Sequence, residues 1–276
     1  MSQVTIADIT KLRKVTGAGM MDCKKALEEA NGDMEKAIEN IRKKGQLVAS
    51  KRADRDASEG AVLSGTSADG KFGAVIALNC ETDFVAKNQD FIGLAQLILN
   101  SAIESKPADL ESLKNFSVNG TKLGDLVVEK IGITGEKMDI SYYGCVEAEK
   151  VISYIHPGNQ LACIAGFNLA GIEIQVYKDI AMQVAAMNPV AVDKDFVTKE
   201  RIAKELEIGR EQARLDGKAE NMLDKIAEGK LNKFFKESTL LNQEFIKDNK
   251  KTIKQYLQGV NKELTVTDFR RYALKD

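Results

Sequence analysis

Residues that could carry chemistry are few in this sequence. Of its 276 residues only one is histidine, His156, and the four cysteines, Cys23, Cys80, Cys145 and Cys163, lie far apart without a C-x-x-C spacing. Zinc sites and redox motifs need closely spaced ligands, and covalent catalysis needs a nucleophile beside a base. No such pair is recognisable, and isolated cysteines among apolar or small residues indicate buried free thiols in a reducing cytosol. The sequence therefore predicts a protein that is not an enzyme and that uses no metal or cofactor.

One stretch imitates a phosphate-binding loop. Residues 65–71, Gly-Thr-Ser-Ala-Asp-Gly-Lys, satisfy the G-x-x-x-x-G-K half of the pattern. A working loop continues with Ser or Thr, for Mg²⁺, and with a helix whose N-terminus faces the phosphates. Here Phe72 follows and opens a β-favouring run, and Asp69-Gly70 is the usual pair of a type I′ hairpin turn. We therefore expect a β-hairpin at this place and no direct nucleotide binding.

The stretch Glu81-Thr82-Asp83-Phe84-Val85 lies where a strand gives way to a helix predicted over residues 83–102. Thr82 or Asp83 can cap that helix by accepting a hydrogen bond from an N–H group of the first turn. The bulky Phe84 comes next, and two interpretations are open. It either begins the core face of the helix or stands exposed for binding. The continuation of that core face is predicted to be Phe91, Ala95 and Ile98.

The elements around this stretch predict an α+β fold in several units. Residues 1–45 predict three short helices separated by Gly-containing breaks, a unit too small to be very stable alone. The apolar stripes of its helices are Ile6, Ile9, Leu12 and Val15; Met20, Cys23, Ala26, Leu27 and Ala30; and Met34, Ala37, Ile38 and Ile41. Residues 46–58 are predicted to be a charged linker, residues 59–138 a first core subdomain, and residues 139–197 with 236–276 a second.

The two core subdomains repeat one order of elements. Strand, turn, strand and helix follow each other at 61–104 and again at 151–187, which indicates a pseudo-repeat of two α+β subdomains with antiparallel sheets. In the second copy the strand-to-helix junction is 168–171, Asn-Leu-Ala-Gly, without an Asp-Phe pair. The fold can thus form this junction without Phe84, which favours a functional role for that residue.

Residues 198–235 predict a projecting antiparallel helical hairpin, because their apolar stripe is too narrow for burial in a core. Self-association through this hairpin is one use for it. A last strand is predicted over 264–272, and it contains a second Thr-Asp-Phe, residues 267–269. This copy follows no hairpin and opens no helix, so we interpret it as a chance match.

Charge and hydropathy exclude several classes of binding partner. Lys and Arg number 40 against 41 Asp and Glu, so the chain as a whole does not attract nucleic acid or an anionic membrane. No run approaches the roughly 20 apolar residues of a membrane span, and the N-terminus has no signal-peptide core, which predicts a cytoplasmic protein. An RNA-binding or ribosome-associated adaptor that uses the basic linker and the hairpin remains the main alternative, although no aromatic residues are interleaved to stack on bases.

Two motifs resemble those of the bacterial translation elongation factor Ts family. The stretch Thr82-Asp83-Phe84-Val85 resembles its Thr-Asp-Phe-Val signature, and residues 12–27, LRKVTGAGMMDCKKAL, are similar to its N-terminal signature. The turn 153–158, Ser-Tyr-Ile-His-Pro-Gly, resembles a Tyr-x-His turn of the family. The resemblance covers nearly the whole chain. It implies that residues 1–45 form a ubiquitin-associated-like domain and that residues 198–235 form the family's coiled-coil hairpin.

The resemblance also implies a function, guanine-nucleotide exchange on elongation factor Tu, in which no bond is made or broken. Asp83 and Phe84, flanked by Thr82 and Val85, are the implied wedge that disturbs the Mg²⁺ site of this GTPase, so that Mg²⁺ and GDP leave and GTP later displaces the factor. The implied further contacts are Arg13, Met20, Met21 and His156. A C-terminal helical module of some family members is not expected here, because four residues follow Tyr272.

Overall fold

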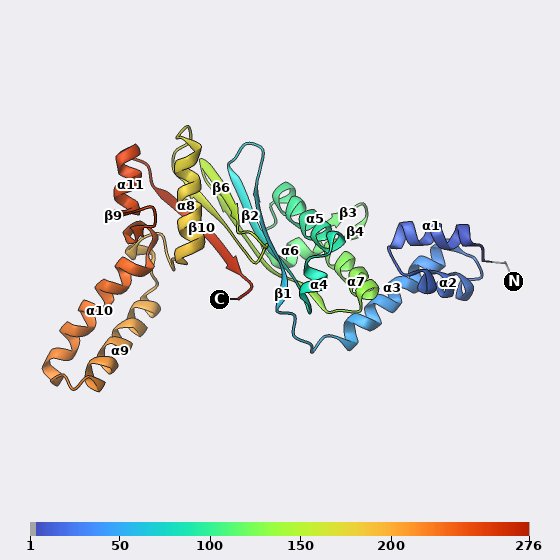
Figure 1. The fold of residues 1–276 in the computed structure, drawn as a ribbon, viewed down its shortest axis with the longest axis horizontal. Coiled ribbons are helices and arrows are strands. Elements are labelled where there is room, and N and C mark those ends of the chain that lie inside the picture. The colour runs from blue at the N-terminus through green and yellow to red at the C-terminus, as the bar shows by residue number, and fades with distance from the viewer. Residues whose placement is uncertain (1–3, 276) are drawn as a thin grey trace.

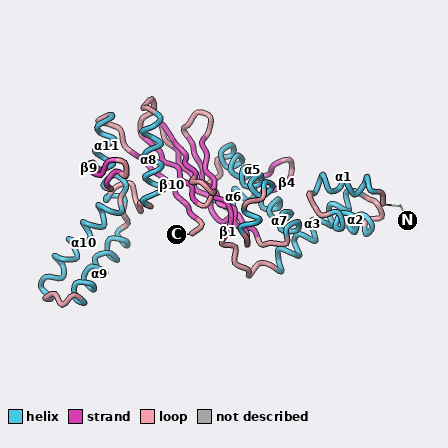
Figure 2. Tube along the Cα trace, in the orientation of Figure 1, coloured by secondary structure: helices cyan, strands magenta, loops and turns pink. Residues whose placement is uncertain are grey.

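The structure is a computed structural model and describes residues 4–275. Residues 1–3 and 276, which belong to the first and last predicted units, lie outside the described residues. Figure 1 shows an elongated molecule with helices α1–α3 at one end, a mixed body in the middle and the pair α9 and α10 at the other end. The strands gather in the middle, with helices on either side of them (Figure 2). The predicted α+β class is therefore confirmed.

The N-terminal unit consists of three helices, α1 (Ile6–Thr16), α2 (Met20–Glu29) and α3 (Met34–Lys51). Thr5 and Asp8 form a capping box at the start of α1, and Gly17 ends it in the left-handed region with φ 69°. The small core of the unit is formed by Ile9, Leu12, Ala18, Cys23, Ala26, Leu27, Ala30 and Ala37. The predicted stripe of α1 was wrong at both ends, because the side chains of Ile6 and Val15 are exposed.

Two three-stranded antiparallel sheets form the body. Their strand orders are β1-β2-β5 and β10-β7-β6. The strands are β1 (Glu59–Thr66), β2 (Phe72–Cys80), β5 (Met138–Glu147), β6 (Lys150–Ile155), β7 (Leu161–Phe167) and β10 (Val266–Ala273). The sheets pack face to face through Val62, Val75, Ala77, Val146, Val151, Ala162 and Ile164. This packing explains why every residue of β2 is buried: its alternate residues face the other sheet and a layer of helices.

The pairing of β5 corrects one predicted boundary. Residues 139–147 were assigned to the second core subdomain, but β5 pairs with β2 along its length, from Cys80 opposite Met138 to Phe72 opposite Glu147. It therefore completes the first sheet. The sequence offers no signal for this pairing, because β5 is followed at once by β6 and a hairpin of neighbouring strands is the commoner arrangement.

Helices cover the outer face of each sheet. Over the first sheet lie α5 (Gln89–Ser105), α6 (Leu110–Asn115) and α7 (Leu123–Thr134), with the small hairpin β3 (Ser117–Val118) and β4 (Thr121–Lys122). Over the second lie α8 (Ile174–Met187), α11 (Ile253–Val260) and the hairpin β8 (Glu244–Phe245) and β9 (Asp248–Thr252). Short 3₁₀ turns occur at Lys194–Phe196, Glu220–Met222 and Leu240–Asn242.

The helices α9 (Lys199–Leu215) and α10 (Leu223–Ser238) form the predicted antiparallel pair. It projects from the body beyond α8 (Figure 1). Gly209 lets the two backbones approach closely, since a Cβ there would lie 3.0 Å from the Cα of Ala227. The buried residues of the two helices are Gly209, Ala213, Leu223 and Ala227. The buried surface between α9 and α10 is therefore narrow, as the sequence predicted.

Candidate partner-binding site

Phe84 lies on the turn that follows β2, and 83% of its surface is accessible to solvent. The helix predicted over 83–102 is in fact two helices, the single turn α4 (Asp83–Ala86) and the long α5. Asn88 separates them, because its backbone is extended (φ −69°, ψ 133°) and its side chain caps α5 by accepting from the N–H of Asp90 at 2.8 Å. This break takes Phe84 out of the register of the α5 core face, where Phe91 is fully buried. The core interpretation of Phe84 is therefore wrong.

Thr82 holds the turn that presents Phe84. Its Oγ1 accepts from the N–H of Val85 at 3.4 Å, which caps α4, and donates to Oε1 of Glu136 at 2.7 Å. Its backbone N–H donates to the other carboxylate oxygen of Glu136 at 3.1 Å, and its carbonyl oxygen accepts from Cys80 Sγ at 3.2 Å. Thr82 is thus anchored through its amide, its carbonyl and its side chain. We call residues Glu81–Val85 the β2–α4 junction.

Glu81 ties the same junction to helix α3. Its carboxylate accepts from Arg52 Nη1 at 3.2 Å, from Arg55 Nη1 at 3.2 Å and from the backbone N–H of Lys137 at 2.7 Å. Burial by itself would raise the pKa of Glu81, but the hydrogen bonds from Lys137 and Arg55 and the charges of Arg52 and Arg55 outweigh it, so the pKa lies below its ordinary value. Glu81 therefore stays ionised and fixes the start of the junction.

Asp83 and Val85 complete the exposed turn. The carboxylate of Asp83 accepts from Lys87 Nζ at 2.6 Å, and this hydrogen bond holds the pKa of Asp83 below its ordinary value. Both side chains of the pair are largely accessible to solvent, and such exposed ion pairs contribute only about 0–1 kcal/mol. Asp83 can therefore exchange Lys87 for another partner at little cost. Val85 points the other way and packs against the core of the first subdomain.

The corresponding junction of the second sheet is built differently. After β7, the hydroxyl of Tyr177 donates to the carbonyl of Leu169 at 2.8 Å and accepts from the N–H of Ile172 at 3.2 Å. Leu169 packs against the second core. This junction is closed by an aromatic residue that is buried, whereas the β2–α4 junction is held by carboxylates and presents its aromatic residue to solvent.

The predicted N-terminal contacts also lie on the surface. Met20 and Met21, in the first turn of α2, are 52% and 76% accessible, and Arg13 on α1 is exposed. The predicted apolar stripe of α2 was wrong at Met20, because Cys23 and Leu27 lie in the core and Met20 does not. The structure does not bring these residues next to Phe84: α2 lies at the N-terminal end of the molecule and α4 near its middle (Figure 1).

His156 lies at the exposed turn between β6 and β7, and its Nδ1 is 3.1 Å from the hydroxyl of Tyr154. The turn meets the first sheet where the N–H of Val62 donates to the carbonyl of Asn159 at 2.7 Å. Val62 is three residues along β1 from Glu59, which pairs with Cys80, the residue before the junction. The structure thus brings the His156 turn and the β2–α4 junction to the same end of the sandwich.

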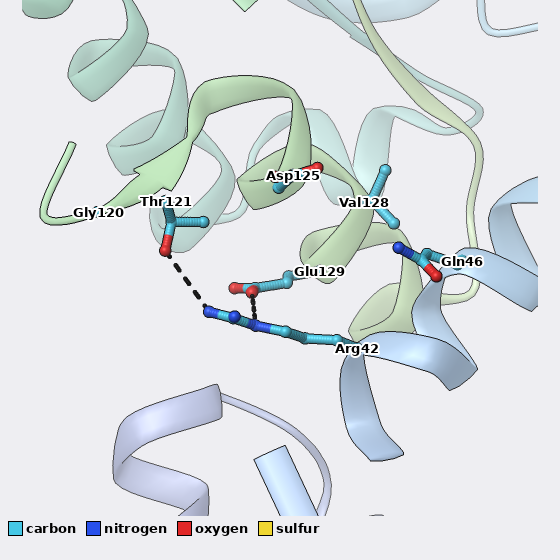
Figure 3. A pocket seen from close by; sticks show the side chains of 7 residues that line it. All are labelled: Arg42, Gln46, Gly120, Thr121, Asp125, Val128 and Glu129. Atoms are coloured by element: carbon cyan, nitrogen blue, oxygen red, sulfur yellow. Dashed lines mark hydrogen bonds and ion pairs between the residues drawn. The ribbon is translucent and has the colours of Figure 1, made fainter. Parts of the chain in front are cut away.

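Helix α3 connects the N-terminal unit to this end of the sandwich. It crosses α7 at two glycines, where a Cβ on Gly132 would lie 2.7 Å from the Cα of Gly45. Arg42 donates to Glu129 at 2.7 Å and to Thr121 at 3.5 Å beside the crossing (Figure 3). The helix is continuous across the predicted boundary at residue 45, so the N-terminal unit is attached to the body by a packed helix.

The two stretches that we interpreted as chance matches, the G-x-x-x-x-G-K stretch and the second Thr-Asp-Phe, lie in a hairpin turn and in a strand. Gly70 is in the β1–β2 hairpin turn with φ 67°, and Lys71 pairs with Glu149 at 3.0 Å, so the G-x-x-x-x-G-K stretch precedes a strand as predicted. In the second Thr-Asp-Phe, Asp268 pairs with Arg270 and the half-buried Phe269 packs against the second core.

Comparison with known proteins shows to which family the chain belongs. The family described as Elongation factor TS matches residues 81–276. An elongation factor Ts of Porphyromonas gingivalis is 57% identical over 272 residues, covering 98% of both chains. Those of Christiangramia forsetii and Bacteroides thetaiotaomicron are 48% and 42% identical and cover 99% of this chain, and 100% and 99% of their own length. The chain belongs to the elongation factor Ts family.

Two residues that hold the β2–α4 junction in place, Glu136 and Arg52, were missed from the sequence. Glu136 lies 54 positions from its partner Thr82, and Arg52 lies 29 positions from its partner Glu81, in segments whose contact depends on the tertiary fold. Within residues 4–275, no cluster of His, Cys, Asp and Glu could hold a metal ion. In the same part of the chain, the helices are all too short or too polar to cross a membrane.

Proposed function

We propose that the β2–α4 junction is the element with which this chain acts on its partner. As a member of the elongation factor Ts family, the chain is a nucleotide exchange factor for elongation factor Tu in translation elongation, and it is not an enzyme. The observation that supports our assignment is the exposure of Phe84 on a turn whose backbone is held on both sides. The protein acts where translation takes place, in the cytoplasm.

The thermodynamic task is to weaken a tight complex. Nanomolar binding of GDP corresponds to about 12 kcal/mol, so a factor that releases GDP must bind the nucleotide-free GTPase with a matching preference. In our proposal Phe84 enters a space between helices of the GTPase and Asp83 leaves Lys87 to disturb the polar groups around Mg²⁺. Mg²⁺ and GDP then leave, and the factor stays bound until GTP displaces it.

Further contacts provide affinity. Arg13, Met20 and Met21 form one docking surface on a ubiquitin-associated-like domain, and His156 forms another beside the junction. The first surface is attached to the body through α3, which packs on α7, and the second is joined to the first sheet by the hydrogen bond from Val62 to Asn159. A rigid multipoint contact loses little conformational freedom on binding, which favours a tight complex.

We divide the chain accordingly into units. The N-terminal domain comprises residues 1–45, with α3 continuing into the linker 46–58. The first core subdomain extends to residue 147, because β5 completes its sheet, and the second comprises residues 148–197 and 236–276. The orders β1-β2-α5 and β6-β7-α8 support an internal pseudo-repeat, and residues 198–235 form the coiled-coil hairpin.

The test is release of a fluorescent GDP analogue from elongation factor Tu, with and without this protein. We expect the release rate to rise with the concentration of the factor and to saturate. A salt-titrated RNA-binding assay on the same preparation examines the alternative of an RNA-binding adaptor. Binding of RNA with a steep salt dependence, together with unchanged GDP release, would contradict the proposal.

A further inference from the structure

Glu136 holds Thr82 from outside the junction through two hydrogen bonds, because one of its carboxylate oxygens accepts from the amide and the other from the hydroxyl. It follows Gly135, which ends α7 in the left-handed region with φ 73°, and it is half-buried. The next residue, Lys137, donates its backbone N–H to Glu81. Two consecutive residues just before β5 thus hold two consecutive residues just after β2.

This arrangement matters because α4 is a single turn of four residues. One helical turn fixes many dihedral angles for few hydrogen bonds and is not stable by itself. Its cap is the hydroxyl of Thr82, and the orientation of that hydroxyl is set by its donation to Glu136. The direction in which Phe84 leaves the surface therefore depends on a carboxylate 52 residues away in the sequence.

We propose that Glu136 is a positioning residue for nucleotide exchange, which keeps the α4 turn formed in the free protein so that Phe84 is presented in its binding orientation. This inference rests on the proposed role of Phe84. A turn that had to be ordered on binding would reduce the apparent affinity by the fraction of time it is unformed. Glu136 itself touches no nucleotide and acts through Thr82.

The first measurement is amide hydrogen exchange in the free full-length protein. Glu136→Ala is expected to speed the exchange of the Thr82, Val85 and Ala86 amides about tenfold, because hydrogen bonds to a charged group are lost. Glu136→Gln keeps one acceptor oxygen and should recover part of the protection. Glu149→Ala removes a glutamate that is ion-paired with Lys71 at the far end of the hairpin and should leave these amides unchanged.

The second measurement is a double-mutant cycle in the GDP-release assay. Glu136→Ala should lower kcat/KM about tenfold in the wild-type background and less than about twofold when Phe84 is already alanine. Thr82→Val, which lacks the hydroxyl but keeps the shape, should reproduce the loss if Glu136→Ala does not fold.

Three results would overturn the inference: an equal loss in both backgrounds, unchanged amide exchange in Glu136→Ala, or full activity of Thr82→Val. Failure of the proposed function is recognised separately, because elongation factor Tu would then release GDP at the wild-type rate when it is mixed with Phe84→Ala alone. In that case the amide exchange of Glu136→Ala still decides whether the carboxylate holds the turn.

Discussion

Replacement of Phe84 by alanine should separate stability from function. The ring is 83% accessible, so only about a sixth of its surface is covered by the protein. At about 25 cal/mol per Å², and with an aromatic side chain burying at most about 200 Å², the lost burial corresponds to about 1 kcal/mol or less of the free energy of unfolding. We expect Phe84→Ala to melt within a few degrees of the wild type.

The effect on exchange should be much larger. Truncation of an aromatic anchor at an interface typically costs roughly 2–4 kcal/mol, which corresponds to a loss of about 30-fold to several-hundred-fold in kcat/KM. The assay is stopped-flow release of a fluorescent GDP analogue from elongation factor Tu at several concentrations of the variant. Circular dichroism and thermal melting of the same sample establish that the variant is folded.

Phe91 is the matched control, because it is a phenylalanine seven residues away that is fully buried. Phe91→Ala should lose about 3–5 kcal/mol of stability, while the fraction that remains folded exchanges nucleotide normally. The reasoning is refuted if Phe84→Ala unfolds the protein and its folded remainder is fully active. It is equally refuted if the folded variant stimulates GDP release from elongation factor Tu at the wild-type rate.

Other predictions concern other parts of the chain. Phe269→Ala should lower the melting temperature and leave the nucleotide-exchange activity of the folded protein intact, because this ring packs against the second core. Slow nucleotide exchange without loss of stability would contradict this prediction. Met20→Ser with Met21→Ser should raise KM several-fold without a change in the melting temperature, and an unchanged KM would remove the methionines from the interface. Replacing residues 202–231 by a short Gly/Ser loop should preserve the thermal transition of the body and abolish any self-association seen by ultracentrifugation, because α9 and α10 bury mainly each other. Glu81→Gln should be less stable than the wild type at neutral pH. Because the folded pKa of Glu81 lies below the ordinary value of 4.5, the difference between the two proteins in the free energy of urea unfolding should shrink as the pH falls below 4.5 and through the folded pKa. A difference that stays constant down to pH 3 would contradict this prediction.

Local patterns in the sequence predicted most elements. The pair Asp69-Gly70 predicted the place of the hairpin, but the turn is not type I′, because Gly70 has a positive φ and Asp69 does not. The Gly-containing breaks predicted helix ends, and Gly17 does end α1. The stripe of α1 failed for a geometric reason. Steps of three residues advance by about 300°, so residues nine positions apart, such as Ile6 and Val15, face opposite sides of the helix. A signal for the break between α4 and α5 was present, because Asn88 with Asp90 two residues later is a good N-terminal cap.

What could not be predicted depends on contacts between distant segments. The Glu81–Arg52 and Thr82–Glu136 hydrogen bonds join residues 29 and 54 positions apart, and nothing in the local sequence of either partner specifies the other. The pairing of β5 with β2 is of the same kind. The break at Asn88 takes Phe84 out of the register of α5, and these contacts hold the turn that presents Phe84 in place.

The free protein keeps an aromatic ring in water at a position where its fold does not need one, as the Tyr177-closed junction of the second sheet illustrates. Full burial of a phenylalanine side chain is favourable by roughly 1.5–3 kcal/mol. In our proposal this free energy becomes available only when the GTPase adopts a conformation with a space for the ring. A ligand shifts an equilibrium only by its differential affinity for the two states, so exposure before binding and burial in one state of the partner are both required. A polar substitute at position 84 would have no such preference for the open partner, and the Asp83–Lys87 ion pair is too weak to replace it.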